Sequence, residues 1–141
     1  MAFSIEHLLN IDAEPTEVYH AVSTEDGYKK WWTTECYGDF TTGGEVHFDI
    51  GERYKNTFKV KYLDPGHRVV MQCMESVPEW KDTSIDIRIS RSESGTTVRF
   101  THSGYAESND FYAHCNYSWG YYLKSLKDLL EKGQGTPSHD L

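Results

Sequence analysis

The sequence predicts one α+β domain in which a curved antiparallel sheet holds a long C-terminal helix. Three observations support this fold class: a strand pattern followed by two short helical patterns near the N-terminus, an alternation of apolar and polar residues through the middle, and a final helical stripe of about 24 residues. A length of 141 residues suits a single core. We therefore expect one domain over residues 1–133 and a flexible C-terminal tail over residues 134–141.

The N-terminal region predicts a strand and two short helices. The strand has one apolar face, which also carries His7 and consists of Phe3, Ile5, Leu9 and Ile11. Pro15 suits the first position of a helix, because its missing N–H would be unpaired there in any residue. Ser23 or Thr24 can cap a second short helix that runs to Trp31 and Trp32.

The alternation after this region predicts a hairpin whose register can be derived. If Gly51, Glu52 and Arg53 form its loop, the inner face pairs Ile50 with Tyr54, Phe48 with Asn56 and Val46 with Phe58. The same register places Asp49 opposite Lys55 and Glu45 opposite Lys59 on the outer face. Apolar alternation and charge pairing therefore agree, and the pattern extends the inner face to Val60 and Tyr62.

A second hairpin follows the turn signal Asp64-Pro65-Gly66. The segment 69–74 is apolar on both faces, so its register stays open. A loop over residues 92–95 pairs Ile89 with Val98, Ile87 with Phe100 and Ile85 with His102. These strands predict an antiparallel meander.

The last element is a helix that begins near Ser108 or Asn109 and ends at Gly133. Its apolar stripe consists of Cys115, Trp119, Tyr122, Leu126 and Leu129, with Leu123 and Leu130 beside it. At 1.5 Å per residue the helix is about 36 Å long. A helix that crosses the whole domain needs a concave surface, and this indicates that the sheet is curved.

Composition excludes several classes of partner. A net charge of −8 argues against nucleic acid, because phosphate binding depends on Lys and Arg. No apolar run approaches about 18 residues, and no basic segment precedes an apolar one, so we expect a cytoplasmic protein without membrane spans. Three widely spaced cysteines predict buried reduced thiols. No motif predicts a cofactor, and a homodimer remains open.

Local motifs over most of the chain resemble one family. They are IDAEPTEVY at residues 11–19, KWW at 30–32, HSGY at 102–105, and WGYYLKSLK at 119–127 followed by LEKG at 130–133. In this order and spacing they resemble the Aha1-C-like (activator of Hsp90 ATPase homologue) branch of the START-like, or Bet v 1-like, helix-grip superfamily. The resemblance implies a cavity between sheet and helix that holds small apolar or amphipathic molecules.

The resemblance does not extend to activation of Hsp90. The eukaryotic co-chaperones after which the branch is named carry a further N-terminal domain, for which this chain has no room. We therefore do not expect Hsp90 as a partner.

The inner face of the predicted sheet is the candidate ligand site. Its polar groups are the side chains of His7, Asn56 and His102 and the hydroxyls of Tyr54, Tyr62 and Tyr122. Apolar walls with a few polar groups are typical of a small-molecule pocket, although a filled core would show the same pattern. We predict that the ligand-binding residues are Trp32, Phe48, Asn56, Phe58, Trp80, Phe100, His102, Trp119 and Tyr122.

Two alternatives remain open. A cyclase- or hydrolase-type enzyme would use His7 and His102 as acid–base groups, because the first and last strands pair in this fold. An interaction or chaperone-helper protein would show an exposed apolar patch on the outer sheet. Metal binding is not predicted: Glu45 and Asp49 flank His47 on a face where lysines oppose both acids, and His114 and Cys115 diverge on their helix.

Overall fold

The computed structural model describes residues 2–137 and has an α+β architecture. Seven strands and three helices follow one another along the chain: β1 (Phe3–Ile11), α1 (Pro15–Ser23), α2 (Glu25–Trp31), β2 (Glu35–Gly38), β3 (Glu45–Ile50), β4 (Tyr54–Asp64), β5 (Arg68–Glu75), β6 (Ser84–Ser92), β7 (Gly95–Tyr105) and α3 (Asp110–Lys132). No helix among these residues is long and apolar enough to cross a membrane.

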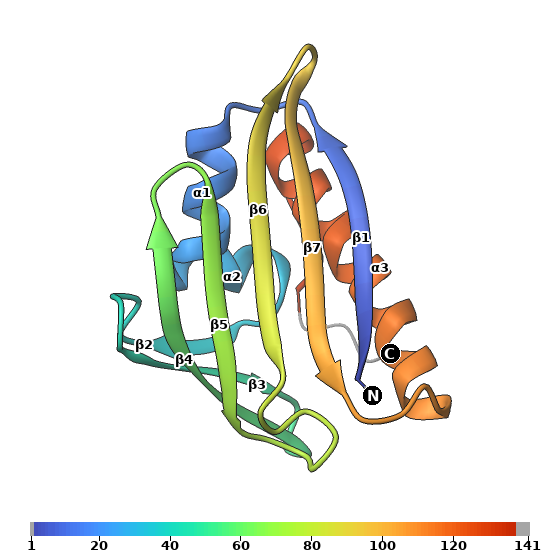
Figure 1. Cartoon of the computed structure of the whole chain (residues 1–141). Helices are drawn as coiled ribbons and strands as arrows, with labels where there is room; N and C mark the ends of the chain where they lie inside the picture. Colours follow the sequence, from blue (N-terminus) through green and yellow to red (C-terminus); the bar gives the residue numbers. More distant parts are fainter. Residues whose placement is uncertain (1, 138–141) are drawn as a thin grey trace.

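The strands form one curved antiparallel sheet in the order β1-β7-β6-β5-β4-β3-β2. The two ends of the sheet, β1 and β2, do not pair with each other, so the sheet stays open. Helix α3 runs along the inner face, and α1 and α2 lie at one end of it (Figure 1). This arrangement confirms the predicted helix-grip fold.

The derived registers of both hairpins are confirmed. Strands β3 and β4 pair Phe48 with Asn56, and β6 and β7 pair Ile85 with His102. On the outer face Asp49 lies opposite Lys55, with 3.8 Å between carboxylate oxygen and Nζ. The second loop is tighter than predicted, because Ser92 and Gly95 pair with each other and leave two residues in the turn.

The prediction for Tyr62 was wrong. The register between β4 and β5 shifts between Val60 and Tyr62, and Lys61 is the extra residue of this bulge. The bulge reverses the alternation beyond it, so Tyr62 points outward with 47% of its surface exposed. The Arg68 guanidinium lies over its ring at 5.7 Å. Strand β2 was not predicted as a separate element, because its four residues are too short for a pattern.

The predicted helix boundaries are confirmed by their caps. Thr24 Oγ1 accepts a hydrogen bond from Gly27 N at 2.9 Å, and Asn109 Oδ1 accepts one from Tyr112 N at 3.0 Å. At the C-terminus of α3, Gly133 adopts φ 84°, a left-handed conformation that favours glycine. These local signals position the long helix along the sheet.

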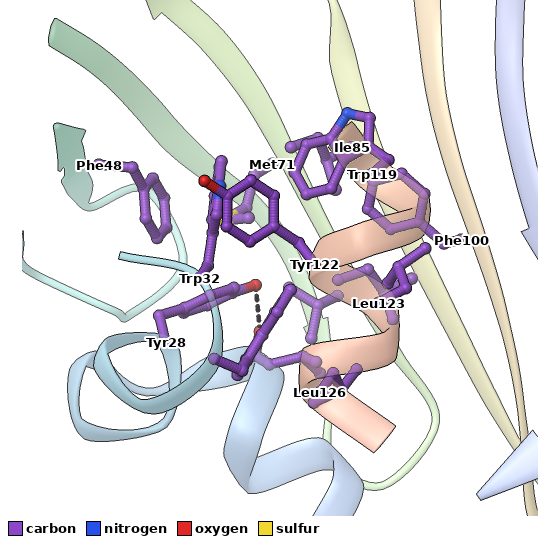
Figure 2. Close-up of a cluster of buried hydrophobic side chains, with 14 of the residues drawn as sticks. Tyr28, Trp32, Phe48, Met71, Ile85, Phe100, Trp119, Tyr122, Leu123 and Leu126 are labelled. Atoms are coloured by element: carbon purple, nitrogen blue, oxygen red, sulfur yellow. Dashed lines mark hydrogen bonds between the residues drawn. The ribbon is translucent and has the colours of Figure 1, made fainter. Parts of the chain in front are cut away.

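The core lies between the sheet and the buried face of α3 (Figure 2). From α3 it receives Cys115, Trp119, Tyr122, Leu123, Ser125 and Leu126. All three cysteines are free and buried. Ser125 Oγ donates to Trp31 O at 2.9 Å and accepts from Thr136 N at 2.7 Å. The predicted tail therefore begins with a segment that contacts α3, and residues 138–141 lie outside the described part.

Candidate functional site

A cavity of about 450 Å³ separates the first half of α3 from the β3–β4 hairpin. This volume falls in the range of small-molecule sites. The end of α2 and the loop between β5 and β6 complete its wall. The lining residues are Trp32, Ile50, Gly51, Glu52, Arg53, Tyr54, Asn56, Trp80, Phe111, His114, Cys115, Ser118, Trp119 and Tyr122.

The structure separates the nine predicted ligand-binding residues into two layers. Five line the cavity: Trp32, Asn56, Trp80, Trp119 and Tyr122. The other four are buried in the core and do not line it: Phe48, Phe58, Phe100 and His102. Their side chains point to the predicted inner face, but a layer of tryptophans covers them.

Three tryptophans form this layer. Trp32 stacks on Phe48 with 4.4 Å between ring centroids, and Trp119 lies over Phe100 at 4.5 Å. Trp80 makes edge-to-face contacts with Phe58, at 6.3 Å between ring centroids, and with His102, at 4.9 Å between ring centroids. Because aromatic surfaces pack densely in these geometries, a ligand would contact the tryptophans rather than the rings beneath them.

Trp119 contacts the tryptophans on both sides of the cavity, Trp32 and Trp80. Its ring is 4.9 Å from that of Trp32 and 6.1 Å from that of Trp80, to which it is parallel within 7°. Cys115, Trp119 and Tyr122 lie on one face of α3, so all three side chains point toward the sheet. The site thus presents flat aromatic surfaces from α2, α3 and the β5–β6 loop.

Asn56 is the buried amide of the cavity wall. Its Nδ2 donates to Phe48 O at 2.8 Å, across the predicted β3–β4 pair. Its Oδ1 accepts from the Ser76 hydroxyl at 2.5 Å. These bonds orient the side chain, and a second N–H of the amide remains as a potential donor.

His102 lies behind the wall, and its contacts determine its tautomer. Trp119 Nε1, which can only donate, lies 3.0 Å from His102 Nδ1, so Nδ1 carries the lone pair. The proton is then on Nε2, which donates to Thr83 Oγ1 at 2.8 Å, and this hydroxyl donates to Trp80 O at 2.5 Å. Burial lowers the pKa of His102 to about 3. His102 is therefore a neutral structural residue.

The two histidines of the enzyme hypothesis do not meet in a cavity. Strands β1 and β7 pair as predicted, with Ile5 opposite His102 and His7 opposite Phe100. However, His7 packs toward α3 at Gly120, where its Cε1 would be 3.7 Å from an added Cβ. Neither His7 nor His102 lines the cavity.

The metal-ligand candidates also remain separate. His47 Nδ1 lies 3.0 Å from Thr57 Oγ1, and its ring stacks on Tyr37 at 4.6 Å. Within residues 2–137, no three His, Cys, Asp or Glu side chains come together in a way that could hold a metal ion. His114 and Cys115 both border the cavity, but from one helix only.

Sequence comparison identifies the family. The family model described as Activator of Hsp90 ATPase homolog 1-like protein matches residues 12–131. The chain belongs to this family. A search of curated proteins found no match.

Solved structures of similar fold include one with substantial sequence identity to this family member. The Aha1 dimer from Colwellia psychrerythraea, determined in solution, is 39% identical, with a TM-score of 0.86 over 94% of this chain and 99% of that chain. SSP2350 from Staphylococcus saprophyticus is 18% identical, with a TM-score of 0.78 over 95% and 96% of the two chains.

A third similar structure is longer than this chain. DynU16, a protein of the dynemicin biosynthetic locus, is 18% identical, with a TM-score of 0.83 over 97% of this chain and 49% of that one. At 18% identity, SSP2350 and DynU16 support the shared fold alone.

The sequence did not reveal several of the residues that line the cavity. On α3, Phe111 lies four residues before Cys115 and Ser118 lies three residues after it, and this spacing was a usable signal. His114 lies four residues before Ser118 on the same side of the helix. In the β3–β4 hairpin, alternation predicted that Ile50 and Tyr54 face inward, but the turn residues 51–53 carried no such signal. These turn residues reach the cavity only because the curved sheet brings the β3–β4 turn toward α3.

Proposed function

We propose that this protein is a cytoplasmic binding module for a small apolar or aromatic molecule, which it holds in the cavity between α3 and the β3–β4 hairpin. One observation carries the proposal: three tryptophans and Tyr122 surround about 450 Å³ of space that no side chain fills. Apolar area would supply most of the binding free energy, and the few polar groups of the wall would orient the ligand.

The charge distribution supports an uncharged or weakly polar ligand. The deep wall contains the Asn56 amide and the neutral His102 behind it, whereas the charged side chains Glu52 and Arg53 belong to the hairpin turn. Arg53 lies over the Tyr54 ring at 5.6 Å. A buried anion would lack a cation deep in the cavity, and such burial is costly.

The alternatives have weaker support. The acid–base enzyme hypothesis relied on His7 and His102, and neither histidine lines the cavity. An interaction protein would need a contiguous apolar face, but the exposed large apolar side chains come from five different elements: Phe3, Leu8, Tyr37, Tyr62, Met74 and Tyr117.

Blocking the cavity tests the proposed function. Ser118→Trp places an indole at a lining position of α3, so we expect the affinity for the apolar dye N-phenyl-1-naphthylamine to fall at least about tenfold. Tyr117→Trp is the control, because Tyr117 is 67% exposed and does not line the cavity. Dye fluorescence measures both. Equal affinities for the two variants, or no dye binding by the unmodified protein, contradict the proposal.

We further propose that the protein forms a homodimer, since a relative of 39% identity is described as a dimer. Light scattering after size-exclusion chromatography should give twice the monomer mass of 16.3 kDa. If the measured mass stays that of a single chain at all concentrations up to about 1 mM, a homodimer with a Kd below about 1 mM is rejected.

A further inference from the structure

The cavity has a buried aromatic floor and an exposed polar rim. The floor consists of buried residues, namely Trp32, Asn56, Trp80, Cys115, Trp119 and Tyr122. The rim includes exposed residues of the β3–β4 turn and of α3, namely Gly51, Glu52, Arg53 and His114. A ligand that fills the cavity therefore has one part enclosed by aromatic rings and another part close to water.

Arg53 differs from the other arginines of the chain in having no acidic partner. The sequence contains five arginines, and four of them have a nitrogen 2.6–3.8 Å from a carboxylate oxygen: Arg68, Arg88, Arg91 and Arg99. Among residues 2–137, no acidic side chain forms an ion pair with Arg53. Its guanidinium lies instead over the ring of Tyr54, which also lines the cavity, at 5.6 Å from the centroid. The rim therefore carries a positive charge that no carboxylate neutralises.

The other ionisable groups of the rim are His114 and Glu52. His114 lines the cavity from the beginning of α3, across from the turn that carries Arg53, and its imidazole ring has an N–H that can donate to an anion. Glu52 is the one acidic residue among those that line the cavity. The rim thus offers two groups that can bind an anion and one that would repel it, so a cationic ligand at Glu52 is the alternative to exclude.

We propose that the ligand is an aromatic carboxylate, whose ring system lies on the tryptophans and whose carboxylate binds Arg53 at the rim. The inference rests on the proposed function and deepens it. The enclosed part of such a ligand is uncharged, as the deep wall requires, and the charge stays at the rim, where it is partly hydrated. A guanidinium suits this group because its planar N–H donors match the two oxygens of a carboxylate.

Three ligands of similar length test this assignment: 3-(2-naphthyl)propanoate, its primary amide and 3-(2-naphthyl)propylamine. Competition against N-phenyl-1-naphthylamine should show that the unmodified protein binds the carboxylate about threefold to fivefold more tightly than the amide at low ionic strength. This preference should shrink in about 0.5 M NaCl, because salt screens an exposed ion pair. The amine should bind more weakly than the carboxylate.

Two variants that remove the same charge isolate the role of Arg53. Arg53→Gln should bind the carboxylate and the amide equally well. Arg91→Gln should retain the preference for the carboxylate, because Arg91 pairs with Glu14 at 2.6 Å and does not line the cavity. The ratio of the two affinities is the informative quantity, since a change in packing alone would affect both ligands alike.

Several results would overturn the inference while leaving the binding function intact. They are equal affinities for carboxylate and amide in the unmodified protein, a preference that does not change with salt, a preference that persists in Arg53→Gln, and tighter binding of the amine than of the carboxylate. Failure of the dye and all three ligands to bind the unmodified protein would reject both the inference and the proposed function.

Discussion

Between pH 7 and pH 4.5, the free energy of unfolding is expected to fall by about 3 kcal/mol because of His102 alone. In the unfolded chain this histidine takes up a proton near its ordinary pKa of 6.5, whereas burial lowers the pKa in the folded protein to about 3. The unfolded state therefore binds more protons throughout this interval. Stability is fully present above pH 6.5 and is lost as the pH falls toward 3, at about 1.4 kcal/mol per pH unit.

Urea unfolding at several pH values measures this loss. Other groups also titrate, so the informative quantity is the difference in slope between the unmodified protein and His102→Gln, whose amide can still accept from Trp119 and donate to Thr83. The variant should lack the contribution of His102 to the pH dependence of the free energy of unfolding. Its stability at pH 7 will also differ from that of the unmodified protein. If both proteins lose stability in parallel, His102 is not held neutral by the fold.

Gly27→Ala is expected to destabilise the protein by about 1–3 kcal/mol, which corresponds to a fall of roughly 5–10 °C in Tm. A Cβ at this position would lie 2.6 Å from Ala21 Cα and 2.7 Å from Ala21 O. These are backbone atoms of α1, so the added methyl group would force α1 and α2 apart. Thermal unfolding followed by circular dichroism measures the change.

Gly120→Ala is the matched substitution with the opposite expected sign. Gly120 is also helical, but an added Cβ would meet only His7 Cε1 at 3.7 Å, an ordinary contact distance. Alanine should then stabilise α3 by about 0.5–1 kcal/mol through its higher helix propensity. Destabilisation by Gly120→Ala, or stabilisation by Gly27→Ala, would contradict the steric explanation.

Local patterns were sufficient for most of the fold. The paired alternation of β3 and β4 predicted that Asn56 lies opposite Phe48, and the caps at Thr24 and Asn109 predicted where helices begin. The prediction that Tyr62 faces inward was wrong for a specific reason. Alternation assumes a continuous ladder, and the bulge at Lys61 depends on how β4 fits β5, which no local residue type reports.

The candidate site was predictable only in part. Inward alternation correctly indicated the direction of Phe48, Phe58, Phe100 and His102, but it could not show that Trp32, Trp80 and Trp119 cover them. Depth within a core depends on which side chains from other elements pack above a given residue. The pairing of β1 with β7 likewise places His7 opposite Phe100. However, the His7 side chain packs against α3 at Gly120 and does not line the cavity.

The sequence by itself determined the elements of this protein other than β2, their order, two hairpin registers and the family to which the chain belongs. These features depend on interactions between near neighbours, namely capping, alternation and turns, whose signals lie within a few residues. Only the tertiary structure decided that a cavity of about 450 Å³ remains beside α3 and that three tryptophans cover the rings of the inner face. Unfilled volume and the depth of a residue in the core depend on side chains from α2, α3, the β3–β4 hairpin and the β5–β6 loop together.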